Sequence, residues 1–172
     1  RAEAVSTPPK MIVCPADASF FERLAAKEIR RYVYLRTGTL LPIVNEYESG
    51  SGIVVGTKNR SLIRKMAAEA GLGGAADDLA PQQYRLQTAA GTKGERKNAS
   101  ILLVVGGDDL GTLYGAYRLA EHLGVRFYLH GDVLPDEKTR LVMPQLNEAG
   151  KPLFELRGIQ PFHDFPEGPD WW

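Results

Sequence analysis

The chain has 172 residues, 44% of them hydrophobic and 24% charged, which suits one globular domain with its own core. Its 21 lysine and arginine residues balance 21 aspartate and glutamate residues, and this neutrality argues against nucleic-acid binding, which usually leaves a basic footprint. No apolar run approaches the roughly 18–20 residues of a membrane helix, so we expect no membrane span.

The first elements are a strand and a helix. The apolar run "KMIVCP" predicts a buried strand, in which Cys14, the only cysteine, is an unreactive core residue. "DASFFERLAAKEIRRYVYLRTG" predicts a helix that Asp17 or Ser19 caps and Gly38 ends. Its apolar positions recur at helical spacing and predict the buried face, which consists of Phe21, Ala25, Ile29 and Tyr32.

The middle of the chain alternates strands and helices. "LLPIVNE" and "SGIVVGT" predict strands, and "KNRSLIRKMAAEAG" predicts a second amphipathic helix. "QQYRLQTAAG" and "SILLVVGG" predict two more strands, joined by the charged hairpin tip "TKGERKN". A third helix, "DDLGTLYGAYRLAEHLG", and the strand "VRFYL" follow, and a proline-rich connection continues to Lys151. We therefore expect an α/β (α+β) fold, a mixed sheet with about three helices packed mainly on one face.

The stretch "VVGGDDLGTLYG" joins a strand to a helix through glycines, as nucleotide-binding loops do. It lacks the Gly-Lys-Ser/Thr of a P-loop and the G-x-G-x-x-G of a dinucleotide fingerprint. Asp108 and Asp109 also place carboxylates at the start of the helix, where they would cap it and repel a phosphate. We expect no cofactor here.

Gly111 and Gly115 lie inside this third helix, where each glycine costs about 1 kcal/mol relative to alanine. Four residues apart, they share one face, which predicts close approach to another backbone. No set of His, Cys or acidic residues has convincing metal-ligand spacing, so we expect no metal site.

The last twenty residues hold the most site-like chemistry. "LFELRGIQPF" predicts a strand, and polar and aromatic residues follow it: His163, Asp164, Glu167, Asp170, Trp171 and Trp172. Acids and aromatic rings together suit a sugar, which offers hydroxyls and an apolar face. A flexible terminal segment is the other interpretation.

Four passages in order carry a family resemblance: "AAKEIRRYVYLRTGTLLPIV", "GIVVGT", "GGDDLGTLYGAYRLAEHLGVRFYL" and "FELRGIQPFHDF". Together they resemble the N-terminal accessory domain that precedes the catalytic barrel in α-glucuronidases and β-N-acetylhexosaminidases. The resemblance runs from about residue 10 to the end. It implies that residues 1–150 form an accessory domain and that residues 151–172 begin a (β/α)8 barrel, at whose strand ends active sites are built.

The resemblance also implies a function. The chain would be a non-catalytic accessory domain of a glycoside hydrolase, inert alone because the catalytic carboxylates come from later barrel strands. Arg157 of the "RG" motif would grip the sugar in the full-length parent, with His163 and Asp164 in the same pocket. The hexosaminidase aspartate five residues after that arginine is replaced here by Phe162, which favours an α-glucuronidase-like parent. By analogy, the parent would be secreted or periplasmic.

Two alternatives remain open from the sequence. The chain could be a free-standing carbohydrate-binding module that uses Trp171 and Trp172 as a stacking platform. Arg157 could instead form a structural salt bridge with Glu155 or another domain.

Overall fold

The computed structural model of the chain describes residues 7–69, 71, 74, 77–90 and 99–158. Within them the strands form a six-stranded sheet in the order β2-β1-β3-β5-β4-β8 and a two-stranded sheet, β6-β7, which confirms the predicted mixed class. The elements in chain order are β1 (Met11–Val13), α1 (Phe20–Thr37), β2 (Ile43–Val44), β3 (Gly52–Thr57), α2 (Ser61–Glu69), β4 (Tyr84–Ala90), β5 (Ser100–Gly106), α3 (Asp109–His122), β6 (Arg126–Tyr128), β7 (Gly131–Val133) and β8 (Asn147–Gly150).

The large sheet is parallel on one side and antiparallel on the other. Strands β2, β1, β3 and β5 run parallel, whereas β4 pairs antiparallel with both β5 and β8. All six residues of β3 are buried, and so are six of the seven residues of β5. These strands read as unbroken apolar runs in the sequence because both of their faces are covered.

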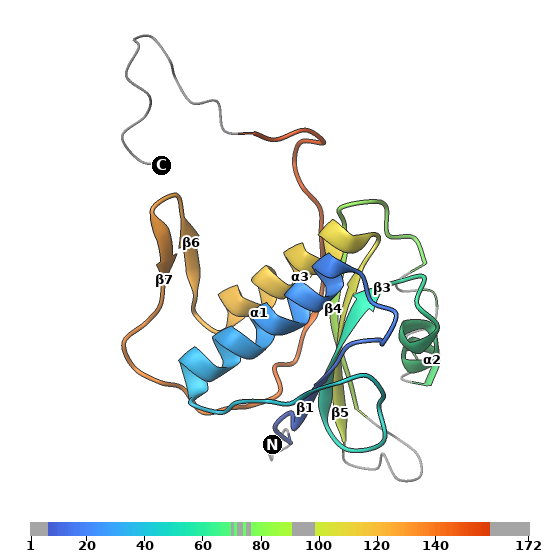
Figure 1. The fold of residues 1–172 in the computed structure, drawn as a ribbon, viewed down its shortest axis with the longest axis horizontal. Helices are drawn as coiled ribbons and strands as arrows, with labels where there is room; N and C mark the ends of the chain where they lie inside the picture. The colour runs from blue at the N-terminus through green and yellow to red at the C-terminus, as the bar shows by residue number, and fades with distance from the viewer. Residues whose placement is uncertain (1–6, 70, 72–73, 75–76, 91–98, 159–172) are drawn as a thin grey trace.

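Helices α1 and α3 lie side by side on one face of the sheet, and α2 covers part of the other face (Figure 1). The larger core cluster joins α1 and α3 to the sheet, and a smaller one lies under α2. The prediction that the helices pack mainly on one face is therefore confirmed. No helix in the described part of the chain has the length and apolar character needed to cross a bilayer.

Both ends of α1 agree with the sequence. Ser19 is the N-cap, and it forms a capping box with Glu22 in which each side chain bonds the other residue's backbone N–H. Gly38 ends the helix in the left-handed conformation, with φ of 78°. The predicted buried face needs one correction, because Phe21 is 38% exposed. The next residue, Glu22, takes the buried position in this first turn instead.

One of the two glycines of α3, Gly111, has the predicted close backbone neighbour, whereas Gly115 faces side chains. A Cβ at Gly111 would lie 2.2 Å from the carbonyl oxygen of Gln83, and one at Gly115 would lie 3.3 Å from Tyr84 Cβ. A contact of 2.2 Å cannot be relieved without moving backbone, so only glycine fits at Gly111. The close backbone neighbour expected of Gly111 is thus the turn that leads into β4.

The segment after β6 differs from the prediction of a simple connection. It contains two strands, β7 and β8, which are too short and too polar to show a periodic pattern. Conversely, residues 153–158 of the predicted strand "LFELRGIQPF" do not form a strand. A strand needs a partner for its backbone hydrogen bonds, and within the described residues none lies alongside this segment.

Arg36 stabilises this irregular region from the last turn of α1. It is buried, and its guanidinium donates hydrogen bonds to the carbonyl oxygens of Leu123 (2.8 Å), Pro135 (2.7 Å) and Glu137 (2.7 Å). These bonds attach the loop after β7 to the carboxyl end of α1.

Candidate functional site

The parallel strands β1, β3 and β5 all end at one edge of the sheet, and a loop leads from each end into a helix (Figure 1). In open α/β sheets, ligands bind outside these carboxyl ends. Polar side chains gather there in two places, one after β1 and β3 and the other after β5. We refer to them as the Glu22 cluster (Asp17, Ser19, Glu22, Thr57 and Arg60) and the Gln82 platform (Gln82, Asp108 and Tyr114).

The Glu22 cluster surrounds a carboxylate that is completely buried. Its Oε1 accepts hydrogen bonds from the backbone N–H of Thr57 (2.7 Å) and from Arg60 Nε (3.1 Å). Its Oε2 accepts from the backbone N–H of Ser19 (2.6 Å) and from Arg60 Nη2 (2.5 Å). Asp17, which is 74% exposed, pairs with the outer side of the Arg60 guanidinium at 3.0 Å.

This arrangement keeps Glu22 ionised. Burial by itself would raise the pKa of Glu22, but the hydrogen bonds from Arg60, Ser19 and Thr57 outweigh it and hold the pKa below its ordinary value. A carboxylate with both oxygens bonded in this way is a poor general base or acid. Its position instead fastens the start of α1 to the end of β3, which is a structural role.

Cys14, the only thiol of the chain, lies beside this cluster. Its Sγ is 3.9 Å from the carbonyl oxygen of Glu22, and the side chain is buried. Burial, with the negative charge of Glu22 adding to it, raises the pKa of the thiol to about 11. The thiol therefore stays protonated at neutral pH, which agrees with the predicted unreactive core residue.

The Gln82 platform is built around the start of α3. Asp108 is the N-cap of α3, and its Oδ1 accepts from the backbone N–H of Gly111 at 2.7 Å and from that of Gln82 at 2.9 Å. The carboxylate occupies the place where a phosphate would bind a helix N-terminus, and this supports the expectation that the glycine-rich turn binds no nucleotide.

Arg157 contacts this platform. Its Nη2 donates to Gln82 Oε1 at 2.6 Å and to Tyr114 Oη at 2.8 Å, and its guanidinium lies 5.4 Å from the centre of the Tyr114 ring. Within the described residues these are its side-chain partners, so the alternative of a salt bridge with Glu155 is not seen. The sequence identified Arg157 as a candidate but not Gln82 or Tyr114. The glycines of α3 were the available signal, because Gly111 lies against the turn that contains Gln82.

The other two predicted sugar-binding residues, His163 and Asp164, lie outside the described residues, so their role stays a prediction. Arg157, the first of the three residues, bonds Gln82 and Tyr114, and its role toward a sugar likewise stays a prediction.

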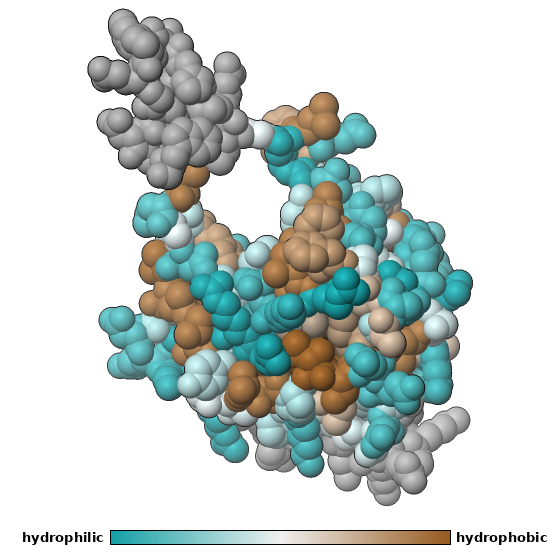
Figure 2. Space-filling model, in the orientation of Figure 1, coloured by the Kyte–Doolittle hydropathy of each residue, from teal (hydrophilic) through white to brown (hydrophobic). Residues whose placement is uncertain are grey.

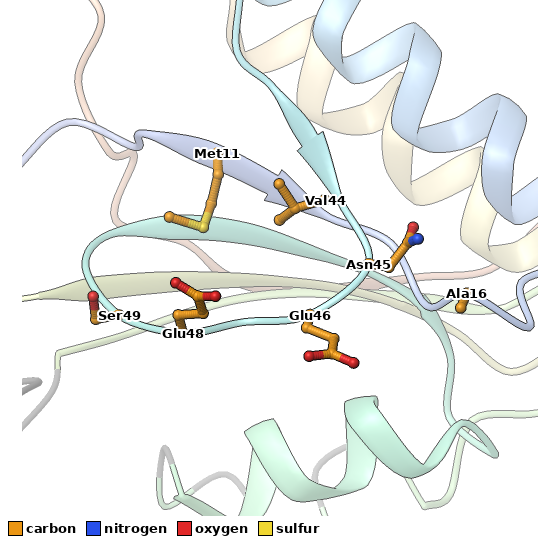
Figure 3. Close-up of a pocket in the computed structure, with 7 residues that line it drawn as sticks. All are labelled: Met11, Ala16, Val44, Asn45, Glu46, Glu48 and Ser49. Carbon is orange, nitrogen blue, oxygen red and sulfur yellow. The ribbon is translucent and has the colours of Figure 1, made fainter.

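A separate hollow of about 520 Å³ lies on the α2 side of the sheet, beside β1 and β2 (Figure 3). Figure 3 shows Met11 and Val44 on the strands and Glu46 and Glu48 on the loop that follows β2. The remaining lining residues are Ala16, Asn45 and Ser49. None of the seven is a histidine, cysteine, lysine or arginine, so the lining offers carboxylate, amide and hydroxyl groups but no fixed positive charge.

Within the described ranges, no group of three or more His, Cys, Asp or Glu side chains is arranged to hold a metal ion. Glu148 forms an ion pair with Arg118 (3.1 Å), and its carboxylate lies 2.6 Å from His122 Nε2. These contacts connect α3 to β8.

No family model and no curated protein matches the sequence. Among solved structures, BtGH115A, a family GH115 4-O-methyl-α-glucuronidase with specificity for decorated arabinogalactans, is similar at a TM-score of 0.57 and 21% identity. The match covers 84% of this chain and 17% of that one. The chain thus has a fold that occurs within a glycoside hydrolase, and it spans a small part of that enzyme's length.

Two further structures have lower scores. A GH138 enzyme targeting pectin rhamnogalacturonan II has a TM-score of 0.40 at 16% identity, over 66% of this chain and 10% of its own. A mutant β-hexosaminidase of Streptomyces plicatus in complex with its product GlcNAc has a TM-score of 0.38 at 15% identity, over 66% of this chain and 17% of its own.

Proposed function

We propose that this chain is a non-catalytic accessory domain of a carbohydrate-degrading glycoside hydrolase and that it supports a catalytic barrel in the same, longer polypeptide. One observation carries the proposal: 84% of the chain matches 17% of an α-glucuronidase structure at a TM-score of 0.57. The order of the quoted sequence passages supports it independently, because that resemblance rests on the residues alone and not on the fold.

The proposed division places the accessory domain at residues 1–150 and the start of the barrel at residues 151–172. The last strand of the large sheet, β8, ends at Gly150, which supports this boundary. In the proposal, residues 153–158 become the first barrel strand when neighbouring barrel strands are present to bond with them. Those neighbours would supply the backbone partners that a strand requires.

Exposed apolar side chains support an interface with more protein. Leu153, Phe154 and Leu156 are 87%, 66% and 91% exposed, which is unusual for three large apolar residues so close together. Figure 2 shows hydrophobic atoms, in brown, where the segment of residues 151–158 leaves the body of the molecule. A barrel packed against this segment would remove that apolar surface from water.

The proposed sugar contacts are Arg157, His163 and Asp164, in a parent of α-glucuronidase-like specificity acting on a polysaccharide outside the cell or in the periplasm. Arginine suits the task because its planar fork presents several fixed donors to hydroxyl groups. The position of Arg157 beyond the carboxyl edge of the sheet supports a role near a ligand, although its present partners belong to the protein.

The test has two parts. We expect the purified 172-residue chain to release no product from 4-nitrophenyl α-glucuronide or 4-nitrophenyl N-acetyl-β-glucosaminide. Turnover that disappears when an acidic residue of this chain is changed would contradict the accessory role. The second part is titration of the same protein with glucuronoxylan and arabinogalactan oligosaccharides, followed by tryptophan fluorescence. Saturable binding by the isolated chain would favour the alternative, a free-standing carbohydrate-binding module.

A matched pair of variants tests the sugar contact in the longer enzyme. Arg157→Ala should lower kcat/KM by about tenfold or more, the effect of losing one hydrogen bond to a charged group. Arg140→Ala, an exposed arginine in the loop before β8, should leave kcat/KM unchanged. Equal activity of both variants would show that Arg157 does not bind the sugar.

A further inference from the structure

We propose that the Gln82 platform is a binding site for the Arg157 guanidinium and that it fixes the course of the chain where it leaves the sheet. In this inference Gln82 and Tyr114 are positioning residues, which act on the segment of residues 153–158 through Arg157. The inference concerns contacts within this chain and does not depend on the proposed function.

One residue of the platform, Gln82, has an unfavourable backbone conformation. Gln82 has φ of 63°, the only non-glycine residue in the described ranges with a positive φ. Such conformations cost free energy and persist where the surroundings impose them, often at functional positions. Here the Asp108 carboxylate imposes it, because it accepts the backbone N–H of Gln82 while it caps α3.

Two glycines make room for this arrangement. A Cβ at Gly107 would lie 2.0 Å from the carbonyl oxygen of Ala80, and one at Gly111 would lie 2.2 Å from that of Gln83. The N–H of Gly107 also donates to the carbonyl oxygen of Gln83 at 2.9 Å. The start of α3 and the turn before β4 are thus pressed together at the level of their backbones, which holds Gln82 and Tyr114 on a rigid base.

The platform contacts the segment through a side chain and through the backbone. Arg157 Nη2 carries two hydrogens, and two acceptors, Gln82 Oε1 at 2.6 Å and Tyr114 Oη at 2.8 Å, lie within reach of them. Arg157 Nη1 donates to the carbonyl oxygen of Phe154 at 2.5 Å, which closes a turn inside the segment. Gln82 Nε2 reaches the carbonyl oxygen of Glu155 at 3.5 Å.

These contacts can open, because Arg157 is exposed and water can replace its partners. The opened state is what trypsin recognises, since cleavage after Arg157 requires its side chain to leave the platform and enter the protease. When opening and closing are fast relative to cleavage, the cleavage rate measures the open fraction. Cleavage of the Arg157–Gly158 bond therefore reports how often Arg157 leaves the platform. The released peptide is easy to detect because it contains both tryptophans of the chain.

The experiment compares the initial rate of cleavage after Arg157 in four proteins under native conditions: the wild type, Tyr114→Phe, Gln82→Asn and Tyr34→Phe. Asparagine keeps an amide and tolerates a positive φ, but it is one methylene too short to reach Arg157. We expect Tyr114→Phe and Gln82→Asn each to raise the rate by about three- to tenfold, the effect of losing an ordinary hydrogen bond, because Arg157 is exposed and water replaces the lost partner. Tyr34→Phe removes an exposed hydroxyl elsewhere and should not change it.

Cleavage after Arg140, followed in the same digests, separates local release from general loss of stability. It should stay at the wild-type rate in all four proteins. Wild-type cleavage after Arg157 in both platform variants would overturn the inference. So would an equal acceleration at Arg140 and Arg157, since that pattern would mean unfolding of the domain, and melting curves would show it directly. Either result would leave the proposed accessory role untouched, because that role is tested by hydrolysis and sugar binding.

Discussion

The Glu22 cluster and the Gln82 platform lie at the same edge of the same sheet, and each uses an arginine to bring distant parts of the chain together. In the Glu22 cluster, the carboxylate is completely buried and both of its oxygens accept hydrogen bonds from within the domain. On the Gln82 platform, the arginine is exposed and is bound by neutral side chains, Gln82 Oε1 and Tyr114 Oη.

The difference shows which polar contacts stabilise the fold and which can be replaced by contacts with water or with a ligand. A buried ion pair is costly to break, because removal of one partner leaves an uncompensated charge in a poorly hydrated place. An exposed arginine can replace one hydrogen-bond partner by water or by another ligand with little change in free energy. The first region is therefore suited to structure and the second to recognition or to a change of position.

The largest effect is expected from Glu22→Ala. It removes the carboxylate that compensates Arg60 and satisfies the N–H groups of Ser19 and Thr57, so the free energy of unfolding should fall by about 3–5 kcal/mol. The matched control is Asp17→Ala, which removes the exposed partner of the same arginine and should cost less than about 1 kcal/mol. Urea denaturation measures both. Equal losses would show that burial does not distinguish the two carboxylates.

The next effect concerns the base of the Gln82 platform. Gly111→Ala should lower the free energy of unfolding by about 1–3 kcal/mol, because the new methyl group would overlap the carbonyl oxygen of Gln83. Gly115→Ala should cost less, since its nearest neighbours are side chains of Val104 and Tyr84, which can shift. Thermal melts provide the comparison. A stabilised Gly111→Ala variant would mean that helix propensity outweighs the overlap.

Acid should weaken the Glu22 cluster. The folded pKa of Glu22 lies below its ordinary value of 4.5, so the unfolded chain takes up this proton first. The stability that Glu22 contributes is complete above pH 4.5 and is lost as the pH falls toward the folded pKa. Denaturation midpoints at several pH values should therefore drop on acidification, and less so in Glu22→Gln. An identical pH profile in that variant would assign the acid sensitivity to other carboxylates, such as Glu148.

The smallest effect on stability is expected from Arg157→Ala. Its contacts are exposed, so the free energy of unfolding should change by less than about 1 kcal/mol, even though the segment of residues 153–158 loses its attachment. Urea denaturation measures the free energy of unfolding, and amide hydrogen exchange of residues 153–158 measures the loss of attachment of that segment. A loss as large as that of Glu22→Ala would erase the distinction between the two regions.

Much of the fold could be predicted from local patterns. The apolar runs of β3 and β5, the N-cap Ser19 and the C-terminal Gly38 each depend on residues close together in the chain, and the structure confirms them. The glycine pair of α3 predicted a close backbone neighbour; Gly111 has one in the turn at Gln83, whereas Gly115 faces the side chains of Val104 and Tyr84.

The rest depends on contacts between distant residues. Strand β8 has the sequence "NEAG", which has no strand pattern, and it exists because β4 offers unpaired backbone groups beside it. Arg36 looks like an ordinary surface arginine of a helix, and its burial follows from the loop that folds over it. Likewise, Gln82 and Tyr114 are 32 positions apart, and only the folded chain brings them to Arg157.

The direction of β8 has a mechanical consequence. Strand β1 begins near the amino edge of the sheet, whereas β8, antiparallel to β4, ends at the opposite edge. Tension applied between the two ends of the described chain would pull these strands along their lengths, so the hydrogen bonds between strands would be loaded together in shear rather than opened one after another. Four residue pairs join β8 to β4 and three join β1 to β3, so each pulled strand is held to the interior of the sheet by a short ladder.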